Sequence, residues 1–261
     1  MQLKLLLLIC FIVSCVLLNA QNNVWNNKQC AVVLTYDDAI EQQLINALPV
    51  LDSLHLKATF YLTAYFAKNN LNDWKNVAAK GYELGNHTLF HPCNGGKGRE
   101  WVKADYDLLH YSVQRMVDET RMTNVFLESL DGKKERTFAF TCGDMKVNDT
   151  SFIDVMKKDF VAARAIRNEM HSIDKVDLYN VDCYVVNNHT AAQMMEWVEK
   201  AKQTNSLLVI LFHGVGGGNS LNVSVAEHSK FLHSLKQNEK DLWITTMLNA
   251  AVYIKKQQTK L

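Results

Sequence analysis

Proline and glycine are scarce in this chain, and neither sign of charge dominates it. Its 261 residues include only 2 prolines and 11 glycines, which argues against a long disordered linker. The formal net charge is +1, so no basic surplus would draw the protein to nucleic acid or anionic lipid, and no protein partner is evident. With 48% hydrophobic and 21% charged residues, the composition is that of an ordinary folded domain with a sizeable core.

Long apolar runs are absent from the sequence except near its N-terminus. Residues 5–18 are almost continuously apolar, follow Lys4 and precede Ala20 and a polar stretch, a pattern typical of a secretory signal peptide. The run is shorter than the roughly 20 residues that a membrane-spanning helix needs. We therefore predict a signal peptide over 1–20 and an exported protein, periplasmic or extracellular. The residues before Cys15 also resemble a lipobox, so lipid anchoring there is the less favoured alternative.

Closely spaced cysteine pairs are also absent. Of the 6 cysteines, two fall within the apolar run, and the other four lack the Cys-x-x-Cys spacing of zinc-binding and redox motifs. Export permits disulfides, but a domain of this size does not require them. We therefore expect free, buried thiols at Cys30, Cys93, Cys142 and Cys183.

The rest of the sequence alternates between strand-like and helix-like segments. Alternating strands and helices imply βα units and a parallel sheet, and about seven such units predict a closed or nearly closed α/β barrel. Without an internal repeat or a linker, one domain over 21–261 is expected. Short apolar runs predict strands at 31–36, 58–62, 82–84, 137–141, 160–164, 207–212 and 242–245. Helical spacing predicts helices at 40–54, 73–80, 101–130, 151–158, 191–204, 225–235 and 247–256, with 165–189 mostly loop.

Four polar clusters come directly after predicted strands. In parallel α/β proteins, reactive groups gather where strands end and loops begin, so these clusters are expected to converge on one face. They are Asp37-Asp38, the segment 86–92 with two histidines, Thr141-Cys-Gly-Asp144 and His213-Gly214.

The two histidines of the second cluster have the spacing of metal ligands. His87 and His91 are four residues apart, which would place both imidazoles on one side of a helical turn. Two imidazoles and one carboxylate with an open position make a catalytic zinc-type site, or a site for another borderline divalent metal. Of Asp37 and Asp38, one can ligate the metal while the other addresses the metal-bound water. The alternative, a solvated turn with incidental histidines, is disfavoured because both clusters follow strands.

Three of these segments resemble motifs of the polysaccharide deacetylases, the NodB-homology domain of carbohydrate esterase family 4. They are Thr35-Tyr-Asp-Asp38, His87-Thr-Leu-Phe-His91-Pro92 and Leu211-Phe-His213, in the family order. The resemblance implies a distorted (β/α) barrel and a hydrolase that removes O- or N-linked acetyl groups from a polysaccharide or oligosaccharide by attack of a metal-bound water. The implied cofactor is a divalent metal, zinc first, with cobalt or nickel as alternatives.

The resemblance also implies a role for each matched residue. Asp37 matches the catalytic base and His213 the general acid. The metal ligands would be Asp38, His87 and His91, the pocket for the acetyl methyl would be lined by Leu211, and the backbone N–H of Cys142 would help to hold the oxyanion.

The third and fourth family motifs are altered. Ala139 stands where the family carries an arginine that pairs with the catalytic base. We hypothesise that Arg164, at the end of the next predicted strand, replaces that arginine; a surface arginine is the alternative. Asp182 matches the acidic fourth motif only weakly by position, so the group that orients His213 is unidentified.

These departures leave a second class of protein open. A non-catalytic carbohydrate-binding protein could retain the barrel and the metal site, although a pure binder has no need for His213. Hydrolysis of a small amide unrelated to sugars is a third candidate. The sequence favours the enzyme without choosing between esters and amides, or among acetylated xylan, chitin-like oligomers and peptidoglycan.

Trp101 and the other tryptophans of predicted helices are expected to pack rather than to stack on sugars.

Overall fold

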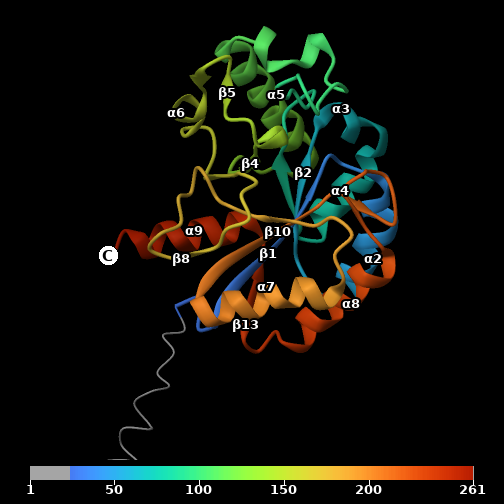
Figure 1. Cartoon of the computed structure of the whole chain (residues 1–261), viewed down its shortest axis with the longest axis vertical. Helices are drawn as coiled ribbons and strands as arrows, with labels where there is room; N and C mark the ends of the chain where they lie inside the picture. Colours follow the sequence, from blue (N-terminus) through green and yellow to red (C-terminus); the bar gives the residue numbers. More distant parts are fainter. Residues whose placement is uncertain (1–23, 261) are drawn as a thin grey trace, which may run out of the picture.

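A nine-stranded, mainly parallel sheet forms the centre of the computed structural model, which describes residues 24–260 (Figure 1). The predicted signal peptide and Cys15 lie outside the described residues. Along the sheet the order is β7-β4-β3-β2-β1-β10-β8, with β13 beside β1 and β9 beside β10. The strands are β1 (Cys30–Asp37), β2 (Thr59–Leu62), β3 (Glu83–Asn86), β4 (Thr137–Ala139), β7 (Ala162–Arg164), β8 (His171–Ser172), β9 (Tyr184–Val185), β10 (Ser206–Phe212) and β13 (Leu242–Thr245).

Helices cover the sheet on more than one side. The outer face packs against α2 (Leu48–Ser53), α4 (Leu71–Ala79), α7 (Ala191–Thr204) and α8 (Val225–Gln237), while α5 (Val113–Asp131) packs near β3 (Figure 1). The last helix, α9 (Met247–Gln258), packs on the opposite face of β1. Shorter elements are α3 (Ala64–Ala67), α6 (Ile153–Met156) and the strands β5 (Lys146–Val147), β6 (Thr150–Ser151), β11 (Gly214–Val215) and β12 (Asn222–Val223).

Alternate residues of the central strands face opposite layers, as the two-residue period of a strand requires. In β1, Val32 and Leu34 face the outer helices, whereas Ala31 and Val33 join the inner cluster that includes α9. Asp37 continues the inward series. The same alternation places Leu211 of β10 in the inner cluster. The inner face therefore carries the polar groups that follow at the carboxyl ends of these strands.

The curled sheet is completed by an irregular segment instead of a regular strand pair. Val181 forms an isolated bridge with Arg164 at the end of β7, and Leu178 O accepts a hydrogen bond from the N–H of Ala163 at 2.7 Å. A few residues later, β9 pairs in parallel with β10. Residues 178–185 thus connect the two sides of a distorted barrel, which agrees with the predicted fold class.

Three predicted helices differ from those observed. The helix expected over 151–158 is reduced to the single turn Ile153–Met156. The helix expected over 101–130 begins only at Val113, since residues before it form turns and short 3₁₀ segments, and Ser112 caps the helix by accepting from Arg115 N–H. The helix expected over 40–54 contains a π segment, Gln43–Ala47, which ends two residues before Pro49. Proline has no N–H to donate, so the regular hydrogen-bond ladder is interrupted there. No helix within 24–260 is long and apolar enough to cross a membrane.

Candidate active site

Asp38, His87 and His91 come together at the carboxyl ends of β1 and β3. Oδ1 of Asp38 lies 3.4 Å from Nε2 of His87 and 3.2 Å from Nε2 of His91. One ligand atom of each of the three residues lies within 4.8 Å of the others. The three groups thus form one converging set of donors.

The loop that presents the two histidines is not the helical turn that the spacing predicted. Thr88 and His91 have φ angles of 65° and 59°, in the left-handed region. Two side chains hold this reversal: Oδ1 of Asn86 accepts from Thr88 N–H at 2.8 Å, and Oγ1 of Thr88 accepts from His91 N–H at 2.9 Å. The imidazole centroids are 4.9 Å apart. A tight loop, held by these local hydrogen bonds, therefore brings the two imidazoles together, as a helical turn was expected to do.

The donor set fits a divalent metal. Nδ1 of His87 lies 2.9 Å from the carbonyl oxygen of Ala139, so the N–H belongs on Nδ1 and Nε2 is left as the ligand atom. Oδ1 of Asp38 is buried and has no hydrogen-bond partner within residues 24–260. A buried carboxylate oxygen without a partner is costly unless something positive faces it. Two imidazoles and one carboxylate are the ligands of catalytic zinc sites.

The charges within this set already influence one another. Burial opposes ionisation of Asp38, but the nearby imidazoles of His87 and His91 hold its pKa well below the ordinary value. Burial opposes the cationic form of His91, yet the nearby carboxylate of Asp38 raises the pKa of that imidazole. The site therefore stabilises an ionised carboxylate that favours a positive neighbour.

Asp37 forms a buried ion pair with Arg164. Its side chain is 3% exposed, and Oδ2 accepts a hydrogen bond from Nη2 of the fully buried Arg164. Oδ2 also lies 3.6 Å from Nε2 of His87. Ala139 on β4 and Arg164 on β7 are direct partners in the strand register. The side chain of Arg164 therefore extends from the strand next to the one that carries the arginine of the family motif. The arginine beside Asp37 is the one that the sequence hypothesis named.

His213 follows β10 and points a partnerless ring nitrogen into the interior. Its Nδ1 is buried with no hydrogen-bond partner among the described residues. Burial lowers the pKa of the imidazole, against the charges of Asp37 and Asp38, which raise it. Asp182 does not orient this ring: its carboxylate accepts from Arg167 at 2.9 Å and lies 2.9 Å from Nε2 of His171.

Cys142 is not the free thiol that the sequence analysis expected. It forms a disulfide with Cys93, whose Cα atom is 5.9 Å away, although 49 residues separate the two in the chain. Cys30 and Cys183 are free and buried, as predicted. The pairing was missed because it depends on two loops that meet only after the sheet has formed.

Two polar side chains that the sequence analysis missed tie the site together. Nε2 of Gln43 donates to the carbonyl oxygens of Asp37, at 2.6 Å, and of His213, at 3.0 Å. Nδ2 of Asn219 donates to Oδ2 of Asp38 at 3.2 Å, from the glycine-rich turn after β10. In that turn Gly218 has φ +86°, and an added Cβ would lie 2.4 Å from Ile40. Neither side chain belongs to a spacing pattern that could have indicated it.

Comparisons with known proteins show the family to which the chain belongs. The sequence model of the polysaccharide deacetylase family matches residues 26–161, and the chain therefore belongs to that family. Over 136 residues it is 26% identical to the uncharacterized protein YlxY of Bacillus subtilis, covering 52% of this chain and 36% of that one. Over 103 residues it is 25% identical to the peptidoglycan-N-acetylmuramic acid deacetylase PdaA of the same bacterium, covering 39% and 38%. The chain thus spans little more than a third of these relatives.

Solved structures share the fold. The wild-type BA3943 protein of Bacillus anthracis, described as a CE4 family pseudoenzyme, superposes with a TM-score of 0.56 at 18% identity, covering 86% of this chain and 66% of that one. Together with the family match, this similarity assigns the chain a CE4-type (β/α) barrel, as the sequence resemblance implied.

Proposed function

We propose that the protein is a metal-dependent carbohydrate deacetylase that removes O- or N-linked acetyl groups from a polysaccharide or oligosaccharide. The observation that carries the proposal is the convergence of the Asp38-His87-His91 donor set with an Asp37 carboxylate held by Arg164. Zinc is the expected metal, with cobalt or nickel as alternatives, because imidazole and carboxylate ligands suit borderline divalent ions. A metal held there would polarise the acetyl carbonyl and acidify water.

Asp37 is the general base in this proposal. Its Oδ1 is buried and has no hydrogen-bond partner in the described part of the chain, so it is the atom that would accept a proton from the attacking water. Arg164 occupies the other oxygen and fixes the plane of the carboxylate.

The remaining residues of the proposed site act on the leaving group and the acetyl group. His213 would donate a proton to the departing oxygen or nitrogen. The backbone N–H of Cys142 would face the oxyanion, and Leu211, which is buried on the inner face, would contact the acetyl methyl. Acetate and a deacetylated sugar would leave.

We also propose that the protein works outside the cytoplasm, in the periplasm or beyond the cell. The Cys93–Cys142 disulfide supports this location, because structural disulfides persist mainly in oxidising compartments. The relative PdaA is named for a peptidoglycan substrate, which is also extracytoplasmic.

Acetate release from acetylated xylan, N-acetylated chitin oligomers and peptidoglycan tests the proposal. Wild-type protein should release acetate from at least one of them, and Asp37→Asn should be slower by roughly 10²-fold or more, since it keeps the shape but removes the base. Absence of release from all three substrates, with glycan binding retained, would favour the second candidate function.

That second candidate is a non-catalytic carbohydrate-binding protein. It is favoured by Nδ1 of His213, which has no hydrogen-bond partner among residues 24–260, and by the fold shared with a protein described as a pseudoenzyme. Against it stands the full set of base, acid and metal-binding side chains, of which binding alone would need only part.

A further inference from the structure

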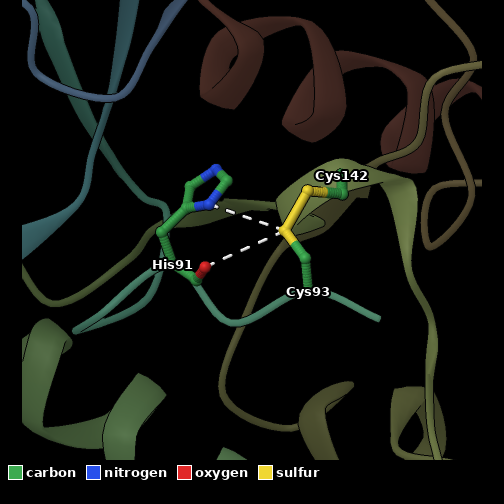
Figure 2. A group of neighbouring side chains, drawn as sticks. All are labelled: His91, Cys93 and Cys142. Carbon is green, nitrogen blue, oxygen red and sulfur yellow. Dashed lines mark hydrogen bonds between the residues drawn. A yellow bond between two sulfur atoms is a disulfide. The ribbon is translucent and has the colours of Figure 1, made fainter. Parts of the chain in front are cut away.

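The Cys93–Cys142 disulfide lies directly beside a proposed metal ligand (Figure 2). Sγ of Cys93 is 3.6 Å from Nδ1 of His91, while Nε2 of the same ring faces Asp38 at 3.2 Å. Metal-ligating histidines generally direct their second ring nitrogen to an acceptor that fixes tautomer and orientation. Ala139 O does this for His87, and the disulfide sulfur, a weak acceptor, takes the same place for His91.

The disulfide also joins two loops, each of which holds one residue in a rarely adopted backbone conformation. His91 has φ 59° and Cys142 has φ 54°, both in the left-handed region, and neither is glycine. Such conformations persist only where the surrounding structure holds them. One of them presents a metal ligand, and the other presents the N–H proposed to face the oxyanion.

Noncovalent contacts connect the same two loops. Oγ1 of Thr141 donates to Pro92 O, and the guanidinium of Arg99 donates to Cys142 O at 3.1 Å and to the carboxylate of Asp144 at 2.5 Å. The disulfide is the one covalent member of this connection, and its Cys93 sulfur contacts the ring of His91.

From this geometry we infer that the Cys93–Cys142 disulfide is a positioning element of the active site, which sets the orientation of His91 and the backbone of Cys142. The inference rests on the proposed function. Breaking the bond should weaken metal binding and slow turnover, because the metal ligand and the oxyanion donor both lose a fixed neighbour. Affinity for the sugar should change little, since Cys93 is fully buried and Cys142 is only partly exposed.

The first test uses the double variant Cys93→Ala/Cys142→Ala of the full chain. Co²⁺ is titrated into metal-free protein and followed by the visible absorption of the bound ion, well below the melting temperature. We expect binding about tenfold weaker or more, the size of effect that partners of metal ligands usually have. In acetate release, kcat should fall while KM stays within about twofold. Cys30→Ala, which removes a free buried thiol at the start of β1, is the matched control.

A second measurement covers the case in which the variant does not fold. A phosphine reductant breaks the disulfide of the wild-type protein: the phosphine becomes a phosphine oxide, water supplies its oxygen and two protons, and two thiols form. Reduced protein that keeps its circular dichroism should bind Co²⁺ more weakly, and reoxidation should restore the affinity.

The outcomes separate the two proposals. Unchanged Co²⁺ affinity and kcat without the disulfide, whatever happens to the melting temperature, would overturn the positioning role and leave the deacetylase intact. Weaker Co²⁺ binding in a protein that releases no acetate would support the positioning role and contradict the proposed function. Wild-type protein that binds no Co²⁺ would contradict both.

Discussion

Arg164 and Ala139 are the pair of residues on which the chemistry of Asp37 depends. They face each other in the strand register, so an arginine side chain from either position starts at the same level of the barrel. Arg164 also lies over the ring of Tyr61, with its guanidinium carbon 5.2 Å from the ring centroid. That ring is itself fixed by a hydrogen bond of 2.9 Å to Thr137.

Removal of Arg164 should slow catalysis and lower stability. Arg164→Ala leaves the buried carboxylate of Asp37 unpaired, so the free energy of unfolding should fall by ~3 kcal/mol or more. Because nothing then holds Asp37 in place, kcat/KM should fall about a hundredfold. The swap Arg164→Ala/Ala139→Arg should recover part of the rate. An Arg164→Ala variant with the wild-type kcat/KM would refute the pairing role.

His213 should set the basic limb of the profile. A general acid must carry a proton, and burial lowers the pKa of His213 below its ordinary value of 6.5. Activity that depends on the protonated ring should therefore fall as pH rises through a value below 6.5. His213→Gln should abolish this limb and slow amide substrates more than esters, since nitrogen leaves poorly without a proton. Equal losses on both substrate types would speak against His213 as the acid.

At the scale of elements, most of the structural features that the sequence did not predict lie in the loops that follow the strands. The segment between Pro92 and α5 was expected to begin a helix, but it forms turns that leave the side chain of Trp101 61% exposed. Its ring centroid lies 6.5 Å from that of His91. An exposed indole beside the proposed metal ligands is suited to stacking on a sugar ring.

Trp101 should therefore contribute to binding of the glycan. Trp101→Ala should raise KM for a polymeric substrate about five- to tenfold, the equivalent of ~1 kcal/mol of lost stacking, with little change in kcat. The KM of a small acetyl ester without a sugar should be unaffected and serves as the control. The same increase for both substrates would show instead that the site as a whole had been disturbed.

Elements whose signal is a local sequence pattern could be predicted, whereas features that depend on particular side-chain contacts could not. Helix α7 was predicted to the residue, since its pattern is local and Thr190 with Gln193 forms a capping box at its start. The reversal at Thr88 was not predicted, because the side-chain hydrogen bonds that hold it leave no periodic signal. The Cys93–Cys142 pair was missed for another reason: it depends on the spatial order of β3 and β4.

At the scale of the whole molecule, the barrel brings together residues from distant parts of the chain. Asp37, His87 and His213 follow β1, β3 and β10, and each lies on the inner face because strands alternate with a period of two. The sequence predicted this convergence from the positions of polar residues after strands. It did not predict how the barrel closes, since residues 178–185 bridge β7 and β10 without a regular strand pattern.

Metal dependence is the claim on which the whole account depends. Asp38, His87 and His91 converge, and Oδ1 of Asp38 is buried without a hydrogen-bond partner among residues 24–260, which is costly unless a cation completes the site. Acetate release from the best glycan substrate should disappear when the metal is removed by a chelator and return when Zn²⁺ is added back. His87→Ala should remain inactive after the same addition. Acetate release that continues unchanged in metal-free protein would contradict the account.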